Sequence, residues 1–248
     1  MSMVVDDVRI AFGERMAVDG LSFSASAGRV LVLVGANASG KSTLLRSLAG
    51  LLPPTSGSIT VDGKSIGDFS PAKRAARIGW MTQRPSLVGR FSVRDVVSIG
   101  RFARPYNPGA VEQAIAEVGL SEHVDRPAED LSIGQQHRVA LARVLAQVPE
   151  DGILLLDEPC APLDPAQVEK CARIIRNRAR AGGTVIVAVH ELRLARALGD
   201  DVLGLADGKS VVSGDMSTLD SQAILDLYGV PSVAGPDGPL PALRVEEE

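Results

Sequence analysis

The feature that most constrains this chain is the segment 35–43, which reads Gly-Ala-Asn-Ala-Ser-Gly-Lys-Ser-Thr. It fits the pattern Gly-x4-Gly-Lys-Ser/Thr of a phosphate-binding loop. The apolar, β-branched run 30–34 before it predicts a buried strand, and the apolar spacing of residues 42–49 after it predicts a helix. Backbone N–H groups and the helix dipole at such a junction attract anions. The segment therefore predicts a nucleotide site.

Side chains within this loop suit phosphate and magnesium. Lys41 is expected to reach the β- and γ-phosphates, and the Ser42 hydroxyl is expected to take one position on Mg²⁺. The alternative is a glycine-rich turn with a chance Lys-Ser pair, but the strand before the loop and the helix after it argue against that interpretation. We predict nucleotide contacts from the loop residues Gly35, Asn37, Ala38, Ser39, Gly40, Lys41, Ser42 and Thr43.

Charge and hydropathy argue against two classes of protein. The chain has 248 residues and a formal net charge of −4, so it offers no general basic face for nucleic acid. Its longest apolar runs, such as 153–156 and 185–189, are far shorter than the roughly 18 residues that a membrane span needs. The first residues lack the order of a signal peptide, which predicts a cytoplasmic location. Cys160 and Cys171 fit no metal-ligand spacing and are expected to be small buried hydrophobic residues.

Apolar runs bounded by glycine, proline and Asp-Gly turns predict the strands. Residues 3–34 alternate as strands broken by turns, and further short strands are expected at 58–61, 78–82, 153–156, 184–189, 202–205 and 210–213. Two Asp-Gly pairs, 62–63 and 207–208, are typical of tight hairpins. A last helix is expected over 217–227. The Pro/Gly-rich, acidic tail 231–248 is expected to be flexible.

Between about residues 84 and 148 the pattern changes from strands to helices. Apolar spacing predicts helices at 93–99, 110–118 and 132–148, separated by proline and glycine breaks. We interpret this stretch as a helical insert in an α/β body. His123 and His137 have charged neighbours here, and both are expected to lie on the surface.

The strand at 153–156 is followed at once by two carboxylates, Asp157 and Glu158. A lone carboxylate pair could simply cap the next helix. With a phosphate loop elsewhere in the chain, we predict instead that Asp157 holds Mg²⁺ and that Glu158 is the general base that polarises the attacking water. Asp164 then precedes Pro165 and is expected to cap a helix that ends near Ala181.

Two other predicted strands end in polar side chains that have a possible role. Gln83 follows the strand 78–82, and His190 follows the strand 184–189. The carboxyl ends of parallel strands meet at one edge of the sheet, where α/β proteins bind ligands. Each residue alone is a weak signal, and a histidine in such a place is most often structural. Their common position makes both of them candidate phosphate contacts.

A third motif carries a family resemblance. Residues 131–139, Leu-Ser-Ile-Gly-Gln-Gln-His-Arg-Val, resemble the signature Leu-Ser-Gly-Gly-Gln of the ATP-binding-cassette (ABC) ATPases. The order and spacing of phosphate loop, signature, acidic strand and histidine match that family from about residue 3 to 230. The resemblance implies ATP as the nucleotide and an α/β P-loop NTPase fold with a RecA-like core, an antiparallel β subdomain and the helical insert. It also implies one domain over 1–230.

The resemblance gives roles to residues of the nucleotide site. Phe12 matches the aromatic residue that stacks on adenine, although alone it fits a core aromatic equally well. Gln83 matches the glutamine that senses Mg²⁺ and water, and His190 matches the histidine that holds the γ-phosphate and orients Glu158. The expected catalytic residues are Glu158, His190, Lys41 and Gln83, and the expected Mg²⁺ ligands are Ser42, Gln83 and Asp157.

The family works as a head-to-tail dimer with two ATP molecules between the protomers. The signature residues Ser132, Gly134 and Gln135 match groups that contact the γ-phosphate bound by the other protomer, and Asp164 matches the aspartate at the dimer seam. This chain departs from the family pattern at four positions. Ile133 stands in place of the first signature glycine, and Ala38, Cys160 and Pro162 are the other departures.

The resemblance implies the ATPase subunit of a membrane transporter, docked on separate permease subunits at the cytoplasmic face of the membrane. The segment between Gln83 and Ser132 would form most of the docking groove, and a substrate-binding protein would act indirectly. Three segments look like the ATPases of importers of ferric siderophores, haem and cobalamin: 70–83, 92–101 and 225–230.

Other ABC proteins fit less well or remain open as alternatives. A zinc or manganese importer and a soluble ATPase for iron–sulfur cluster assembly are both compatible with this length. A chromosome-maintenance ATPase would need a long coiled coil between its nucleotide motifs, and a tandem translation factor would need a second phosphate loop. An inactive cassette is disfavoured because Lys41, Asp157, Glu158 and His190 are all present.

Overall fold

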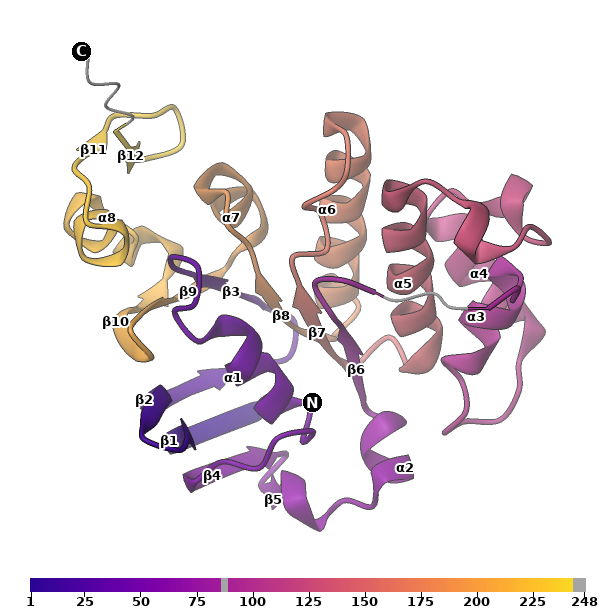
Figure 1. The fold of residues 1–248 in the computed structure, drawn as a ribbon, viewed down its shortest axis with the longest axis horizontal. Helices are drawn as coiled ribbons and strands as arrows, with labels where there is room; N and C mark the ends of the chain where they lie inside the picture. Colours follow the sequence, from indigo (N-terminus) through magenta and orange to yellow (C-terminus); the bar gives the residue numbers. More distant parts are fainter. Residues whose placement is uncertain (86–88, 243–248) are drawn as a thin grey trace.

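The computed structural model describes residues 1–85 and 89–242. A six-stranded sheet crosses the molecule in the order β10-β9-β3-β8-β7-β6 (Figure 1). Its strands are β3 (Val30–Val34), β6 (Ile78–Met81), β7 (Ile153–Asp157), β8 (Thr184–Ala188), β9 (Asp201–Ala206) and β10 (Lys209–Asp215). All neighbours are parallel except β9 and β10, which form the hairpin predicted at Asp207-Gly208. Every residue of β3, β7 and β8 is buried, as their continuous apolar runs predict.

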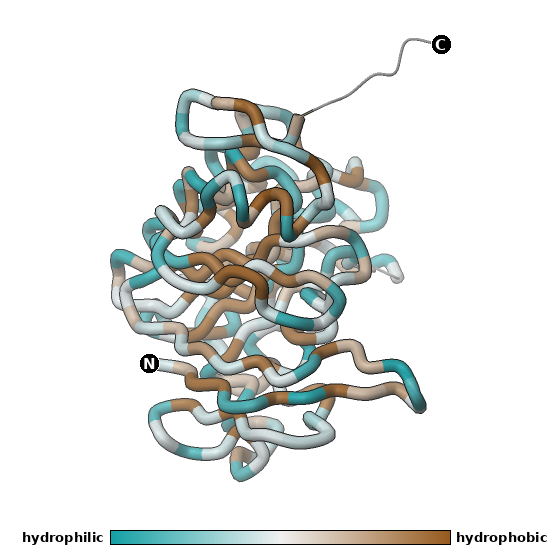
Figure 2. Tube along the Cα trace, turned by 90° about the vertical axis from the view of Figure 1, so that its left-hand side faces the viewer, coloured by the Kyte–Doolittle hydropathy of each residue, from teal (hydrophilic) through white to brown (hydrophobic). Residues whose placement is uncertain are grey.

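The central sheet is covered on both faces. Helices α6 (Pro165–Arg180), α7 (Leu192–Leu198) and α8 (Ser221–Tyr228) cover one face, and α1 (Lys41–Leu48) covers the other (Figure 1). Side chains of β3 alternate between two cores. Val30 and Val32 belong to the core under α6, α7 and α8, whereas Leu31 and Leu33 belong to the core around α1. Figure 2 shows the apolar central strands enclosed by more polar outer segments.

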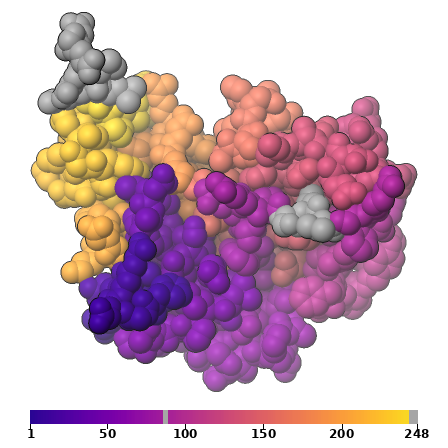
Figure 3. All heavy atoms as spheres, viewed as in Figure 1, coloured from indigo at the N-terminus to yellow at the C-terminus, as the bar shows by residue number. Residues whose placement is uncertain are grey.

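An antiparallel sheet lies against the outer side of α1. Its order is β2-β1-β4-β5, with bounds β1 (Met3–Phe12), β2 (Arg15–Ala25), β4 (Ser56–Val61) and β5 (Lys64–Ser65). The predicted Asp62-Gly63 turn joins the last two strands, and both residues have positive φ, 48° and 76°, as a type I′ turn requires. A short helix, α2 (Pro71–Ala75), leads from this sheet to β6. In Figure 3 this N-terminal part lies beside the C-terminal strands, and β2 contacts β10.

The helical insert contains α3 (Val93–Ile99), α4 (Pro108–Glu117) and α5 (Ile133–Gln147), which pack against one another. These bounds agree with the predicted helices. The expectation that His137 lies on the surface is wrong, because its side chain is buried. The reason is helical periodicity: His137 shares the inner stripe of α5 with Ala140, Leu141 and Val144. His123 is half-buried, and its ring lies 3.0 Å from the Gln135 amide.

The C-terminal part differs in detail from the predicted pattern. The expected helix 217–227 is divided into a 3₁₀ turn, Met216–Thr218, and α8, because Asp220 caps α8 by accepting from Ala223 N–H at 2.9 Å. A small hairpin of β11 (Ser232–Val233) and β12 (Leu240–Pro241) then packs on α8. The end of the expected flexible tail, 243–248, lies outside the described residues. Within 1–85 and 89–242, no helix has both the length and the hydropathy for a membrane span.

Candidate nucleotide site

The phosphate loop connects β3 to α1 and needs glycine at two positions. Gly35 has φ +143°, and an added Cβ would lie 2.2 Å from the carbonyl oxygen of Leu205. Gly40 has φ +107°, and its Cβ would lie 2.5 Å from the carbonyl oxygen of Ala17. Both distances are too short for any side chain. The two glycines therefore let the loop turn tightly between the strand and the helix N-terminus.

Lys41 lies inside this loop rather than in solvent. It is 5% exposed, and its Nζ donates to the carbonyl oxygens of Gly35 at 2.8 Å and of Ala36 at 2.9 Å. Burial lowers the pKa of Lys41, while the carboxylates of Glu158 and Asp157 oppose that shift. The ammonium is thus held by backbone dipoles at the place where an anion would be bound.

Two buried oxygens near Lys41 have no hydrogen-bond partner among the described residues. They are Ser39 Oγ and Asp157 Oδ1. Burial raises the pKa of Asp157, and the nearby Ser42 hydroxyl and Lys41 oppose that shift. An unpaired buried carboxylate oxygen is unfavourable unless a cation or donor meets it.

These oxygens suit Mg²⁺ and phosphate. Mg²⁺ prefers oxygen ligands and is commonly held by one or two protein groups together with phosphate oxygens. Among the described residues, no cluster of three or more His, Cys, Asp and Glu side chains could hold a metal ion by itself. The donor set of Asp157 and Ser42 therefore fits Mg²⁺ that arrives with a nucleotide.

Glu158 lies at the centre of the site. It is 8% exposed and has φ +52°, a left-handed conformation that is uncommon for a residue other than glycine. Its Oε2 accepts from Gln83 Nε2 at 2.9 Å, and its Oε1 contacts His190 Nε2. These three residues follow β7, β6 and β8, which are neighbours in the sheet. The structure thus brings the three predicted strand-end residues together on one carboxylate.

A cavity of about 420 Å³ opens above the loop. Its wall contains Phe12, the loop residues 37–43, Gln83, Glu158 and His190. Phe12 ends β1 and remains 51% exposed, so its ring presents a face to the cavity instead of filling the core. The cavity can hold an anionic ligand beside Lys41 with an aromatic ring at its outer edge.

The signature residues lie outside this cavity in the same chain. Ser132 and Gln135 form a capping box at the start of α5: Ser132 Oγ accepts from Gln135 N–H at 3.3 Å, and Gln135 Oε1 accepts from Ser132 N–H at 3.0 Å. Ile133 is 71% exposed, and Gly134 packs near the Pro162 carbonyl. Asp164 caps α6 by accepting from Gln167 N–H at 3.0 Å. The signature motif and Asp164 therefore occupy exposed helix N-termini.

Comparison with known proteins agrees with this geometry. Residues 18–161 match the family described as ABC transporter. The chain belongs to this family. It is 40% identical to the hemin import ATP-binding protein HmuV of Streptomyces coelicolor over 90% of this chain and 82% of that protein. It is also 36% identical to the phosphonates import ATP-binding protein PhnC of Wolinella succinogenes, over 88% and 84% of the two chains.

Solved structures of ABC proteins share the fold. The dimeric structure of a bacterial ABC transporter cassette matches with a TM-score of 0.79 and 25% identity, over 86% of this chain and 98% of that one. The ATP-binding subunit of another ABC transporter matches with a TM-score of 0.79 and 20% identity, over 93% and 96% of the two chains. The predicted family and fold class are thus confirmed, and the chain is an ABC ATPase.

Sequence reasoning missed two residues of the ABC nucleotide cavity. Arg15 and Ala17, both at the start of β2, line it together with Phe12 at the end of β1. Arg15 is exposed and could attract a phosphate. A cation three residues after an aromatic residue was the available signal, but in sequence it is indistinguishable from an ordinary polar turn.

Proposed function

We propose that this chain is the ATP-hydrolysing subunit of a membrane importer and that it works as a head-to-tail dimer. One observation carries the catalytic part of the proposal: Gln83 and His190 both contact Glu158, beside the cavity of the phosphate loop. A general base must be held within hydrogen-bond reach of the water that it activates. Glu158 would take this role, and its two neighbours would orient it.

The remaining groups suit phosphoryl transfer to water. Lys41 and the loop amides would hold the β- and γ-phosphates, and Phe12 would stack on the adenine. Ser42, Asp157 and Gln83 would hold Mg²⁺, which when bound neutralises phosphate charge. Each of these groups except Asp157 lines the cavity. Asp157 is buried, and its carboxylate interacts with the charge of Lys41 and with the hydroxyl of Ser42.

A second copy of the chain would complete the site. Ser132, Gly134 and Gln135 do not line the nucleotide cavity of their own chain, and at the start of α5 Ser132 is exposed while Gly134 and Gln135 are half-buried. Asp164 is likewise exposed. The dimeric cassette that shares this fold supports an assembly in which these groups reach the partner's γ-phosphate. Hydrolysis would then depend on dimer closure, because only the dimer has the full set of phosphate-binding groups.

The names of similar proteins support import as the direction of transport. Relatives are named for the import of hemin, phosphonates and hypophosphite. We favour a cargo of the ferric siderophore, haem and cobalamin group, because the hemin import protein HmuV of Streptomyces coelicolor is 40% identical. The chain would bind permease subunits at the cytoplasmic face of the membrane, and a substrate-binding protein would act through them. A metal-ion importer and a soluble ATPase for iron–sulfur cluster assembly are the alternatives.

The decisive experiment measures ATP hydrolysis by the isolated chain and by the chain with its candidate permease in lipid. The product of a neighbouring reading frame is the candidate. We expect a low isolated rate that rises when permease and a binding protein loaded with haem are added. A rate that no permease changes would favour the soluble ATPase, and a rise with a different cargo would correct the substrate.

A further inference from the structure

The phosphate loop contacts the C-terminal strands as well as α1. Gly35, its first residue, lies so close to β9 that an added Cβ would be 2.2 Å from the carbonyl oxygen of Leu205. In the middle of the loop, the carbonyl oxygen of Ser39 accepts from Gly208 N–H at 3.1 Å, and Gly208 is in the turn between β9 and β10. The shape of the loop therefore depends on what holds β9 in place.

Helix α8 packs on β9 close to the first residue of the loop. Gly204 of β9 pairs with Val34, the residue before Gly35. A Cβ on Gly204 would lie 2.8 Å from Leu227 Cδ2, so the absence of a side chain at Gly204 lets α8 approach β9 closely. Tyr228 follows Leu227 and is the last residue of α8. The close approach therefore places the end of α8 beside the start of the phosphate loop.

The hydroxyl of Tyr228 is buried and has no hydrogen-bond partner among the described residues. Burial raises the pKa of Tyr228, and the backbone N–H of Gly35 opposes that shift, so the hydroxyl lies near this N–H. The ring packs on the core under α6, α7 and α8. A phenylalanine ring would fill the same space without burying a polar group, and a buried hydroxyl is unfavourable unless it has a partner. The hydroxyl at this position thus points to a contact with the phosphate loop.

Ser39 supplies a second buried hydroxyl near Gly35. Its Oγ also has no partner among the described residues, and it would lie 2.9 Å from a Cβ on Gly35. Ser39 lines the nucleotide cavity, where its hydroxyl can meet a phosphate directly. Tyr228 is not in the wall of that cavity. Tyr228 can therefore affect a bound nucleotide only through Gly35 and the loop.

The segments before and after α8 hold this helix in position. Arg196 of α7 donates from Nη2 to the carbonyl oxygen of Leu219 at 2.6 Å and to that of Pro239 at 3.1 Å. Leu219 lies just before α8, and Pro239 lies just before β12 in the hairpin that packs on α8. Gly229, with φ +69°, ends the helix directly after Tyr228. Tyr228 is therefore fixed from both ends of α8.

We propose that Tyr228 is a positioning residue for the nucleotide: its hydroxyl accepts from Gly35 N–H when the phosphate loop holds ATP, and α8 thereby fixes the first residue of the loop. Lys41 donates to the carbonyl oxygen of Gly35 at 2.8 Å, so side chains would then hold both polar backbone groups of Gly35. A loop fixed in this way binds phosphate more tightly, because it loses less conformational freedom on binding. This role presupposes the ATP binding proposed above.

The test is Tyr228→Phe, which removes the hydroxyl and keeps the ring. We expect the dissociation constants of ATP and of inorganic triphosphate, measured by calorimetry, to rise equally, by about 3- to 10-fold, as loss of one neutral hydrogen bond predicts. The KM for ATP should rise by a similar factor, while kcat stays within about twofold of the wild type. The melting temperature without added nucleotide should stay within about 1 °C of the wild type or rise, because the hydroxyl has no partner to lose among the described residues.

The matched control is Tyr106→Phe, because Tyr106 is the other tyrosine of the chain and is 68% exposed. It should bind both ligands like the wild type. Equal affinities of the wild type and Tyr228→Phe would overturn the role of Tyr228 and leave ATP binding by the loop intact, whereas a wild type that binds no ATP would overturn the proposed function. A lower melting temperature with unchanged affinity would make the hydroxyl purely structural and overturn its role. A loss of affinity for ATP alone would also overturn it, because Tyr228 would then act on the base.

The contact itself can be observed by NMR of the full chain with tyrosine labelled with ¹³C at Cζ. The two tyrosines give two signals, and Tyr106→Phe assigns them. Because the ¹³Cζ shift responds to hydrogen bonding of the phenol oxygen, ATP should move the Tyr228 signal and leave that of Tyr106 unchanged. Inorganic triphosphate should move the Tyr228 signal in the same direction. A Tyr228 signal that neither ligand moves would overturn the proposed contact.

Discussion

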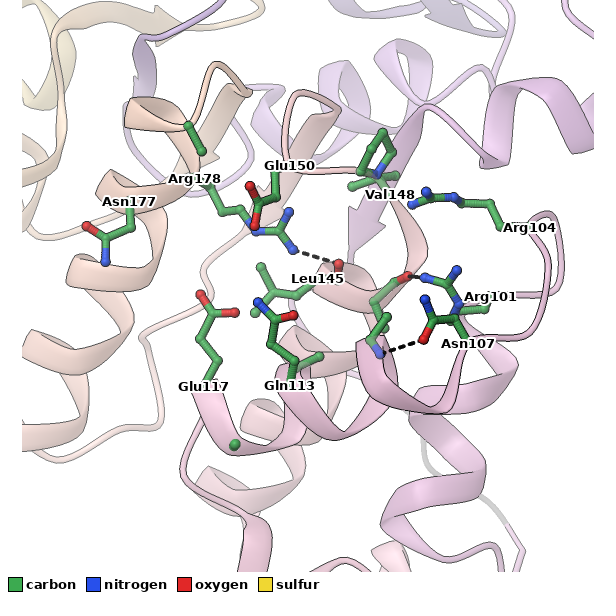
Figure 4. Close-up of a pocket in the computed structure, with 16 residues that line it drawn as sticks. Arg101, Arg104, Asn107, Gln113, Glu117, Leu145, Val148, Glu150, Asn177 and Arg178 are labelled. Atoms are coloured by element: carbon green, nitrogen blue, oxygen red, sulfur yellow. Dashed lines mark hydrogen bonds between the residues drawn. The ribbon is translucent and has the colours of Figure 1, made fainter.

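The nucleotide cavity and a second cavity of about 710 Å³, at the C-terminal ends of α5 and α6 (Figure 4), both contain cations, but the groups that stabilise these cations differ. In the nucleotide cavity, Lys41 is surrounded by carbonyl oxygens and lies near the carboxylates of Asp157 and Glu158. In the second cavity, Arg101 donates to the carbonyl oxygens of Ala146 and Pro105, and burial together with the Arg104 cation lowers the pKa of Arg101. The first site thus supplies carboxylates of its own near the cation. The comparison teaches that a buried cation can be stabilised by carboxylates together with backbone carbonyls, as Lys41 is, or by backbone carbonyls, as Arg101 is.

The largest effect is expected from Glu158→Gln. The amide keeps the shape of the side chain but cannot accept a proton, so hydrolysis should fall by about 100-fold or more. ATP should still bind, and a closed dimer should accumulate on gel filtration with ATP and Mg²⁺. A variant that stays monomeric at saturating ATP would argue against the proposed dimer. Ile133, 71% exposed in the signature, would then be the first residue to examine.

Lys41→Ala should weaken ATP binding by about 10- to 100-fold, because it removes a charged donor from the phosphate loop. The measurement is the dissociation constant for ATP by calorimetry. Lys209→Ala, at an exposed position on β10, is the control and should bind ATP like the wild type. Unchanged affinity in Lys41→Ala would mean that the loop does not bind phosphate through this residue.

Arg178→Met tests how the C-terminal end of α5 is held, at a position that does not line the nucleotide cavity. It leaves the Leu145 carbonyl without its donor, which should cost about 1–3 kcal/mol of unfolding free energy. The melting temperature should fall by about 2–4 °C for each kcal/mol. Arg180→Met is the exposed control on the same helix and should melt within about 1 °C of the wild type. If both variants melt alike, Arg178 is not needed to hold α5.

The smallest effect concerns the rim of the nucleotide cavity. Phe12→Ala removes the proposed stacking face and should weaken ATP binding by about 3- to 10-fold, whereas Phe12→Tyr should preserve it. The two variants should differ for ATP and agree for inorganic triphosphate, which has no base. Equal losses for both ligands would show that Phe12 acts on the phosphates and not on the adenine.

The sequence could predict the features that lie within short, contiguous segments of the chain. The phosphate loop is a contiguous motif, and β3, β7 and β8 are continuous apolar runs, so both were predictable from short windows. The contacts of Gln83 and His190 with Glu158 follow from three strand ends on one sheet edge. The roles assigned to these residues stay predictions.

Features that depend on distant parts of the chain were not predictable. The bonds that join Arg101 and Arg178 to α5 connect three elements far apart in sequence, and no local pattern marks them. His137 was misplaced because its charged neighbours outweighed the periodicity of α5. No helix was predicted at α7, which follows directly after His190.

The alternation of β3 between two cores has a consequence for how the molecule melts. Leu31 and Leu33 face one core, and Val30 and Val32 face the other. Because both cores contain side chains of β3, unfolding of either core would also disrupt the other. The helices of the insert belong to the same core as Val30 and Val32. Heating should therefore give one cooperative calorimetric transition, and the insert cut out as a peptide should not fold by itself.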